Sequence, residues 1–309
     1  MTKLLFMGSD AIALPVLESL RESPQVELAG ILTQPDRPSG RGKKLRMNPV
    51  KAWAVEHGIE VRDPQKPGDD EVRWIQDSGI LISLVMAYGH ILRSNLLDAP
   101  PLETWNLHAS LLPRHRGASP VESAILAGDA ETGVSLMKII PRMDAGPVLD
   151  VEQVSISPDE TSPTLREKLA QACVPLVERN LNILLPGTAQ PEVQDEVAAT
   201  YCTKISKEAG RLDFNLSAID LERRTRAFTP WPGSFLDHGD IRIKVADARV
   251  EVAGPEASPG TIISAGKDGL LVATSSGAIR FLQLQRPGGR MMEAAAFFRG
   301  FGMEVGSVL

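Results

Sequence analysis

The sequence has 309 residues, of which 43% are hydrophobic and 23% charged, and this is typical of a globular protein with two domains. The formal net charge of -6 argues against a general nucleic-acid coat protein, although it leaves room for a local basic patch. Cys173 and Cys202 match no metal-ligand spacing and give no disulfide framework, which fits a reducing compartment. The apolar run at residues 4–7 is too short for a signal peptide or a membrane helix, so we expect a cytoplasmic protein.

Strands and helices alternate in the first part of the chain. The apolar patterns predict strands at residues 3–7, 26–32, 59–61, 80–87 and 105–108, and helices at residues 11–22 and 49–57. This rhythm predicts a doubly wound, Rossmann-like α/β domain, whose active site would lie at the carboxyl ends of the strands. The first turn is Gly8-Ser9-Asp10 and not G-x-G-x-x-G, which weakens the interpretation as a nicotinamide-dependent dehydrogenase.

The second part of the chain has a different texture. Pro186-Gly187-Thr188 and Pro191 mark a stretch typical of a linker. Further on, short apolar segments between Gly and Pro turns predict a small β-barrel, of which the oligonucleotide-binding (OB-like) type is one candidate; the segments are residues 241–245, 260–263, 269–274 and 279–284. We therefore expect a first domain over residues 1–189, a linker over 190–206 and a C-terminal β-barrel over 207–309.

Polar residues able to carry chemistry are densest at residues 106–117. Asn106 and His108 are two residues apart on a predicted strand, so their side chains point to the same face. Asp144 lies in the turn Met143-Asp144-Ala145-Gly146, where its carboxylate could orient an imidazole and favour its cation. Each residue alone has a more ordinary explanation: an Asn that forms a turn, a core or surface His, and any Gly-containing turn.

Together, these segments resemble a known family. The run from Asn106 to Gly117, with Met143 to Gly146, is similar to the folate-dependent formyltransferases. Residues 33–45 resemble the acceptor-stem loop of those formyltransferases that act on methionyl-tRNA, and several motifs between residues 201 and 262 agree. The resemblance covers nearly the whole chain. The first turn departs from it, because Ile12 replaces the usual aromatic residue, and Ala109 stands where the family commonly has Gly.

The resemblance implies transfer of a formyl group from 10-formyltetrahydrofolate to the α-amino group of methionyl initiator tRNA, for translation initiation. Asn106 and a protonated His108 would donate hydrogen bonds to the tetrahedral oxyanion, and Asp144 would stabilise the imidazolium and help to move a proton from the amine. The family implies folate contacts from the end of this loop and from the strand before it, namely Ser110, Leu111, Leu112, Pro113, Met86 and Tyr88. No metal is expected, and we expect a monomer that does not bind membranes.

Six basic residues against one acidic residue lie at residues 34–51 of an otherwise acidic chain. Read alone, this is a solvated charged loop; the resemblance makes it a tRNA-binding loop with contacts from Arg37, Arg41, Lys43 and Lys44. In the same way Arg223, Arg224 and Arg226 are either a phosphate contact or one solvated helix face. The C-terminal domain is expected to bind tRNA.

Other formyl enzymes remain as alternatives. A glycinamide-ribonucleotide formyltransferase would lack the C-terminal barrel, and a formyltetrahydrofolate hydrolase would carry another accessory domain. A sugar-nucleotide formyltransferase is the hardest to exclude, and the loop at residues 33–45 is the discriminating feature. A non-catalytic RNA-binding protein would not need Asn106, His108 and Asp144 together.

Overall fold

The computed structural model describes residues 1–39, 42, 44–251 and 257–309. Their contacts divide the chain into two compact units. The N-terminal unit comprises Met1–Pro120, Glu131–Ser155 and Arg166–Cys202. The C-terminal unit comprises Val121–Ala130, Ile156–Leu165 and Thr203–Leu309. Arg41 and Lys43, two of the four residues predicted to bind tRNA, lie outside the described residues.

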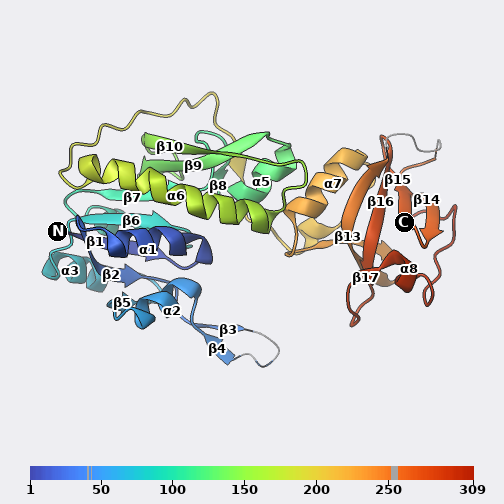
Figure 1. Ribbon diagram of the computed structural model, residues 1–309, viewed down its shortest axis with the longest axis horizontal. Coiled ribbons are helices and arrows are strands. Elements are labelled where there is room, and N and C mark those ends of the chain that lie inside the picture. Colours follow the sequence, from blue (N-terminus) through green and yellow to red (C-terminus); the bar gives the residue numbers. More distant parts are fainter. Residues whose placement is uncertain (40–41, 43, 252–256) are drawn as a thin grey trace. The chain divides into compact units, whose positions relative to one another are not determined.

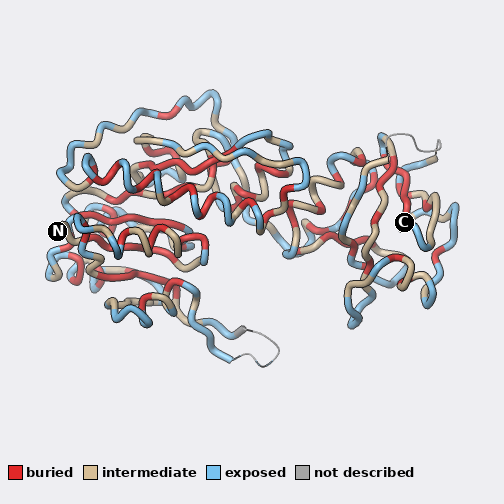
Figure 2. Tube along the Cα trace, in the orientation of Figure 1, coloured by how far each residue is buried: buried red, intermediate tan, exposed pale blue. Residues whose placement is uncertain are grey.

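Within its described residues the N-terminal unit is built on a seven-stranded sheet with the order β10-β9-β7-β6-β1-β2-β5 (Figure 1). Its strands are β1 (Thr2–Gly8), β2 (Val26–Leu32), β5 (Val61–Arg62), β6 (Ile82–Met86), β7 (Thr104–His108), β9 (Glu131–Lys138) and β10 (Val148–Ser155). The five neighbouring strands β7, β6, β1, β2 and β5 are parallel, whereas β9 is antiparallel to both β7 and β10. The central strands are buried along their length (Figure 2).

Helices cover both faces of this sheet: η1 (Ala11–Ala13), α1 (Leu14–Glu22), α2 (Pro49–Glu56), α3 (Asp69–Asp77), α4 (Ser94–Leu97) and the long α6 (Ser162–Leu184). Alternate residues of a strand face opposite sides. On β1, Leu4 therefore lines a small apolar hollow with Val177 and Leu181 of α6. Its neighbour Leu5 packs with Trp74 of α3 on the other face. The predicted doubly wound α/β domain is confirmed.

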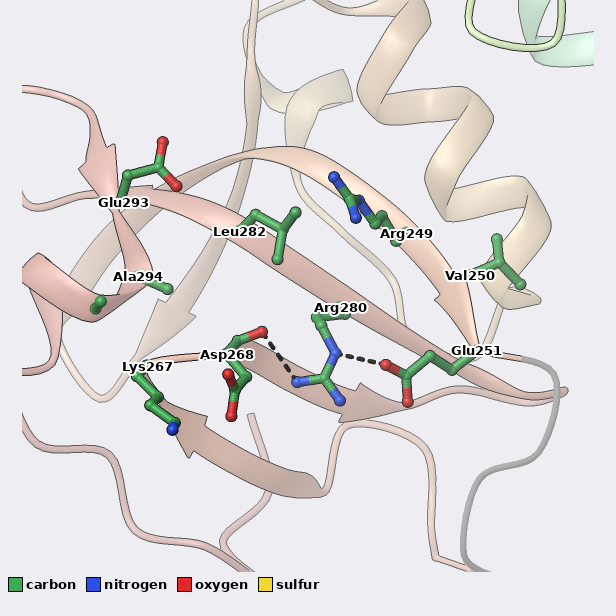
Figure 3. Close-up of a pocket in the computed structure, with 10 residues that line it drawn as sticks. Arg249, Val250, Glu251, Lys267, Asp268, Arg280, Leu282, Glu293 and Ala294 are labelled. Atoms are coloured by element: carbon green, nitrogen blue, oxygen red, sulfur yellow. Dashed lines mark hydrogen bonds and ion pairs between the residues drawn. The ribbon is translucent and has the colours of Figure 1, made fainter.

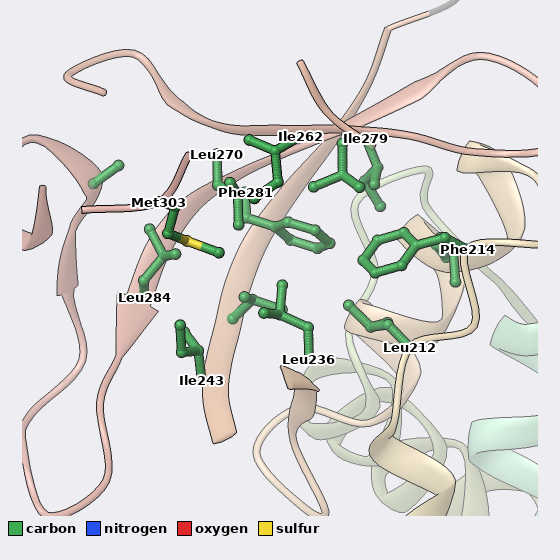
Figure 4. Packing of buried hydrophobic residues seen from close by; sticks show 14 of the residues in the cluster. Leu212, Phe214, Leu236, Ile243, Ile262, Leu270, Ile279, Phe281, Leu284 and Met303 are labelled. Atoms are coloured by element: carbon green, nitrogen blue, oxygen red, sulfur yellow. The ribbon is translucent and has the colours of Figure 1, made fainter. Parts of the chain in front are cut away.

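The C-terminal unit contains an antiparallel sheet, which in its described residues has the order β12-β13-β16-β15-β14, with β17 paired to β16. Its strands are β12 (Ser234–His238), β13 (Ile241–Glu251), β14 (Ile262–Gly266), β15 (Gly269–Ala273), β16 (Ala278–Gln285) and β17 (Met292–Glu293). One cluster of buried hydrophobic side chains forms the core of this unit, and it includes Ile243, Leu270, Phe281 and Leu284 (Figure 4). The helices α7 (Ala218–Ala227) and α8 (Ala294–Phe297) and the short η2 (Glu208–Gly210) belong to this unit, and α5 (Pro120–Ala127) lies in it from Val121 on.

The predicted elements agree with these bounds to within one or two residues at most ends. The predicted helix at residues 11–22 begins as η1 and continues as α1, and the strand expected at 59–61 is centred one or two residues later, in β5. The strand expected at 241–245 extends to Glu251, because Ala248 and Val250 also pack against the core of this unit. The predicted β-rich C-terminal domain is confirmed.

Two small sheets complete the N-terminal unit. The hairpin of β3 (Arg37–Ser39) and β4 (Lys44–Arg46) follows β2. The parallel pair of β8 (Arg116–Gly117) and β11 (Tyr201–Cys202) joins segments that are about 85 residues apart in sequence. This second pair lies next to the candidate active site.

Candidate active site

The carboxyl end of β7 presents Asn106 and His108 on one face. β7 pairs with β6 on one side and with β9 on the other, so both residues lie on an internal strand, at the edge of the sheet where the parallel strands end. His108 is 6% exposed, and its Nε2 lies 2.9 Å from the carbonyl oxygen of His115. A carbonyl oxygen only accepts, so Nε2 carries a proton and Nδ1 is the nitrogen left for chemistry. Within the described residues, the Asn106 side-chain amide has no hydrogen-bond partner and remains available to a ligand.

Asp144 faces the free nitrogen of His108. Its Oδ2 lies 3.8 Å from His108 Nδ1, an ion-pair distance when the imidazole is protonated. The same Oδ2 accepts a hydrogen bond of 2.8 Å from the Gly117 backbone N–H. Gly146 lets the turn approach β9, because a Cβ there would lie 1.8 Å from the carbonyl oxygen of Lys138. The structure thus brings all three predicted catalytic residues to one edge of the sheet.

The backbone around this edge is strained. Among the described residues other than glycine, five have positive φ, and three of these flank the site: Ala87 at 49°, His115 at 55° and Asp144 at 47°. Such conformations cost on the order of 1–3 kcal/mol each and persist where the surrounding structure imposes them. Positive φ values are common at functional sites, so these three residues support the choice of this edge as the candidate active site.

The predicted folate-binding loop follows His108 directly. Ser110 is fully buried, donates its hydroxyl to the carbonyl oxygen of Arg114 at 2.6 Å and accepts at its own carbonyl from Ser135. Leu111, Leu112 and Pro113 are half-buried. These residues therefore offer apolar surface beside His108, while the Ser110 side chain holds the loop together.

Met86 is the last residue of β6, the strand that pairs with β7, and Tyr88 follows two residues later. The side chains of both residues are buried in the interior. Met86 is 1% exposed, and its sulfur lies 3.7 Å from the Cys173 thiol in α6. The Tyr88 ring packs in the cluster with Trp74, and burial together with the charge of Glu71 raises the pKa of its hydroxyl. The structure does not bring these two side chains together with His108, so a folate contact from them would involve backbone atoms.

The basic hairpin carries the described part of the predicted tRNA-binding set. Lys44 is exposed on β4, and Arg37 on β3 donates to the side chain of Gln34 at 2.7 Å. Lys51, which contributes to the basic count, forms ion pairs with Asp36 at 2.7 Å and Asp63 at 2.8 Å. Burial opposes protonation of Lys51, but these two carboxylates outweigh it and raise its pKa. Lys51 therefore stays protonated, and its positive charge is balanced by two carboxylates of the protein itself.

Most arginines in the C-terminal unit are engaged internally. Arg226 pairs with Glu222 at 2.6 Å and donates to the carbonyl of Glu160 at 2.7 Å, and Arg224 donates to the carbonyl of Ala209. A surface hollow of about 680 Å³ in this unit is lined by three basic and three acidic side chains (Figure 3). Because the basic and acidic side chains are equal in number, the hollow has no net charge to attract phosphate, and Arg280 donates to Glu251 within it.

Two residues that sequence reasoning missed support the site. Arg116 is fully buried at the end of the predicted folate-binding loop, and its guanidinium contacts Gln194 and Glu196. Gln194 donates in turn to the backbone of the Asp144 turn. Arg116 lies in the run from Asn106 to Gly117 that the sequence singled out, and this is the signal that could have found it, whereas Gln194 lies in no such motif.

No group of three or more His, Cys, Asp or Glu residues in the described part of the chain is arranged to hold a metal ion. The helices made by described residues include none that is long and apolar enough to cross a membrane.

The fold and the site define a class: a Rossmann-like α/β enzyme with an amide, an imidazole and a carboxylate at the carboxyl edge of its sheet. Residues 2–178 match the formyl transferase family, and residues 204–302 match the formyl transferase C-terminal domain. The first match alone covers more than half of the sequence. The chain therefore belongs to the formyl transferase family, whose reaction class is transfer of a formyl group.

Solved structures of three kinds share the fold. HypX from Aquifex aeolicus in complex with tetrahydrofolic acid is 15% identical, with a TM-score of 0.59 over 96% of this chain and 46% of that one. An N-formyltransferase from Helicobacter canadensis, in complex with folinic acid and dTDP-3-aminofucose, is 16% identical, with a TM-score of 0.68 over 93% of this chain and 100% of that one. Methionyl-tRNA formyltransferase from Clostridium thermocellum is 13% identical, with a TM-score of 0.57 over 82% and 96%. The chain spans about half the length of the HypX chains.

Proposed function

We propose that this protein transfers the formyl group of 10-formyltetrahydrofolate to the α-amino group of methionyl initiator tRNA, giving N-formylmethionyl-tRNA. The observation that supports it most is the convergence of Asn106, His108 and Asp144, with 3.8 Å between the imidazole and the carboxylate. Both family matches agree with formyl transfer, and the likeness to solved structures is in the fold. The choice of tRNA as the acceptor rests on the basic hairpin and on the sequence resemblance of residues 33–45.

The residues fit the reaction. The unprotonated amine attacks the formyl carbon as a nucleophile, and a tetrahedral oxyanion forms. The Asn106 amide and His108 Nδ1–H donate to that oxyanion, while His108 Nε2–H stays on the carbonyl of His115. Asp144 stabilises the imidazolium and accepts the ammonium proton, directly or through water. The bond between the folate nitrogen and the formyl carbon then breaks, and that nitrogen takes up the proton that Asp144 accepted from the ammonium, so that protons and charges balance.

The hairpin supplies the argument for an RNA acceptor. Lys44 is exposed, and Arg37 is exposed on the paired strand. Exposed cations on a projecting hairpin bind phosphates at little desolvation cost. Because Lys51 is paired with two carboxylates, the proposed contact rests on Arg37, Lys44 and the undescribed Arg41 and Lys43.

A sugar-nucleotide amine is the second candidate acceptor. The N-formyltransferase from Helicobacter canadensis aligns over its whole length with the higher TM-score of the structures compared above. A small acceptor would need the catalytic residues but not the hairpin. The two candidates therefore differ in which variants affect the reaction.

The test is formyl transfer from 10-formyltetrahydrofolate, with methionyl initiator tRNA, an amino-sugar nucleotide, glycinamide ribonucleotide and water offered as acceptors. We expect product only on the tRNA, and a raised KM for tRNA when Arg37 and Lys44 are both replaced by Ala. Product on the sugar nucleotide alone, unaffected by the double variant, would overturn the choice of acceptor and keep the catalytic residues.

A further inference from the structure

Residues 192–202, here named the clamp segment, hydrogen-bond to both loops of the candidate active site. At one end, Glu192 exchanges two backbone hydrogen bonds with Val148, at 2.7 and 2.8 Å, just after the Asp144 turn. At the other end, Thr200 Oγ1 accepts from the His115 N–H at 2.8 Å. The carbonyl of His115 is the group that fixes the His108 tautomer. One short segment therefore contacts both sides of the pair of His108 and Asp144.

Gln194 joins the clamp segment to the Asp144 turn. Its side-chain Nε2 donates to the carbonyl oxygen of Asp144 at 2.9 Å and to that of Gly146 at 2.7 Å. Asp144 has a φ of 47°, in the left-handed region that residues with a side chain adopt uncommonly, so the turn needs local support. The two hydrogen bonds from the Gln194 amide, to the carbonyls of Asp144 itself and of Gly146, supply such support.

Arg116 decides which way the Gln194 amide points. Its Nε and Nη2 lie 3.0 and 2.8 Å from Gln194 Oε1. A guanidinium has only donors, so the oxygen of the amide must face it and the NH₂ group must face the turn. Arg116 is fully buried and is held in turn by Glu196, with Nη2 3.0 Å from Oε1. The orientation of the amide therefore follows from the chemistry of its partner.

We propose that Gln194 and Arg116 are positioning residues, which hold the Asp144 carboxylate at its distance from His108 through the clamp segment. This inference rests on the proposed function only in so far as formyl transfer reports the position of Asp144. Neither residue reaches the reacting atoms. A misplacement of about 1 Å in a catalytic group can cost on the order of 100-fold in rate, so a hydrogen bond to the turn backbone is enough to affect the chemical step.

Gln194→Glu is the sharpest variant, because it keeps the shape of the side chain. The carboxylate still accepts from Arg116, but it cannot donate to the carbonyls of Asp144 and Gly146 and instead places an oxygen against them. We expect kcat to fall roughly 10- to 100-fold, with KM for folate and for the acceptor within about threefold. Gln76→Glu, at an exposed position of α3, is the matched control and should keep wild-type kcat.

A readout without substrate separates this inference from the proposed function. The Gly117 N–H donates to Asp144 Oδ2, so its hydrogen exchange, followed by NMR, reports whether the carboxylate stays in place. In Gln194→Glu we expect Gly117 to exchange at least about tenfold faster, with Leu136 in β9 unchanged. If the wild-type protein formylates no amine, the proposed function fails while this measurement still tests the positioning.

The outcomes are distinct. Loss of kcat at constant KM, with faster exchange at Gly117, supports the positioning role. Wild-type kcat, or unchanged exchange at Gly117, in a folded Gln194→Glu protein would overturn it. Should this variant fail to fold, Gln194→Met, which removes the same donors without adding charge, undergoes the same two measurements and decides by the same criteria.

Discussion

At the scale of single residues, the candidate active site depends on which atoms are already occupied. His108 uses Nε2 internally and keeps Nδ1 free, opposite Asp144. Asp144 already accepts from a backbone N–H, so its position does not depend on bound substrate. Asn106 is held by its backbone in the sheet, and its amide is left for a ligand. Fixed donors of this kind stabilise charge that develops in a transition state, because they need no reorganisation.

The first prediction concerns Asn106. Asn106→Ala removes one oxyanion donor and should lower kcat by about 10²–10³, as loss of such a donor typically does. Since the amide has no partner within the described residues, the free energy of unfolding should change by less than about 1 kcal/mol. Asn182→Ala, at an exposed position of α6 whose side chain has no hydrogen-bond partner among the described residues, is the control for both measurements. An unchanged kcat in Asn106→Ala would remove this residue from the mechanism.

At the scale of elements, two tight approaches position the site. Gly117 has a φ of 122°, and a Cβ there would lie 2.0 Å from the carbonyl oxygen of Cys202 in β11. Gly146 lies equally close to β9. Both glycines therefore allow a loop of the site to lie directly against a strand, so that the loops take their geometry from the sheet.

The second prediction follows from Gly146. Gly146→Ala forces a methyl group against the backbone of Lys138, which cannot give way within a sheet. We expect a loss of roughly 2 kcal/mol in the free energy of unfolding and a larger than tenfold loss of kcat, as the Asp144 turn moves away from His108. Gly266→Ala is the matched control, because no atom lies within 4 Å of its added Cβ. Urea unfolding and steady-state kinetics measure the two effects, and a fully active, stable Gly146→Ala enzyme would contradict the argument.

The third prediction separates two lysines of the basic segment. Lys44→Ala removes an exposed cation and should raise the KM for tRNA and reduce the slope of log K against log salt by about one. Lys51→Ala instead breaks two ion pairs of a side chain that is only 16% exposed, so it should lower stability and leave the salt slope unchanged. Binding titrations at several salt concentrations measure the slopes. Equal slopes in Lys44→Ala and wild type would assign Lys44 to an ordinary solvated surface.

At the scale of the whole molecule, stability and acceptor recognition are separable. The buried clusters that hold each unit are apolar, and the proposed tRNA contacts lie on an exposed hairpin. The acidic chain gives no general attraction for RNA, since its formal net charge is -6. Binding of the proposed tRNA acceptor therefore depends on local cations, and it should be sensitive to salt.

The fourth prediction is a loss of stability at alkaline pH. Burial of the Cys173 side chain, which lies in α6, raises the pKa of its thiol from 9.0 to about 12. Between these values the unfolded chain loses a proton that the folded protein keeps, so stability is complete below pH 9 and falls as the pH rises. At pH 10 the loss from this thiol is about 1 kcal/mol. Urea unfolding at pH 8 and pH 10 measures it, and Cys173→Ala should show a smaller difference. The same difference in both proteins would show that the thiol is not responsible.

The sequence by itself determined the alternation of strands and helices and the change to a β-rich C-terminal domain. It also determined that the side chains of Asn106 and His108 lie on the same face of one strand. These features follow from local periodicity: apolar runs set the strands, and a spacing of two places both side chains on one face. It also pointed to Asp144 and to the basic loop, through motifs that a family resemblance made meaningful.

Only the tertiary structure decided what contacts each of these residues. It showed that Lys51 is neutralised by Asp63, and that the side chains of Met86 and Tyr88 belong to the core. It also showed that residues 192–202, which fall in the predicted linker at residues 190–206, hydrogen-bond to both loops of the site. Partners such as Arg116 and Gln194 are 78 positions apart in sequence, and no local pattern encodes their contact. It exists because the fold brings two loops and a returning strand to one edge of the sheet.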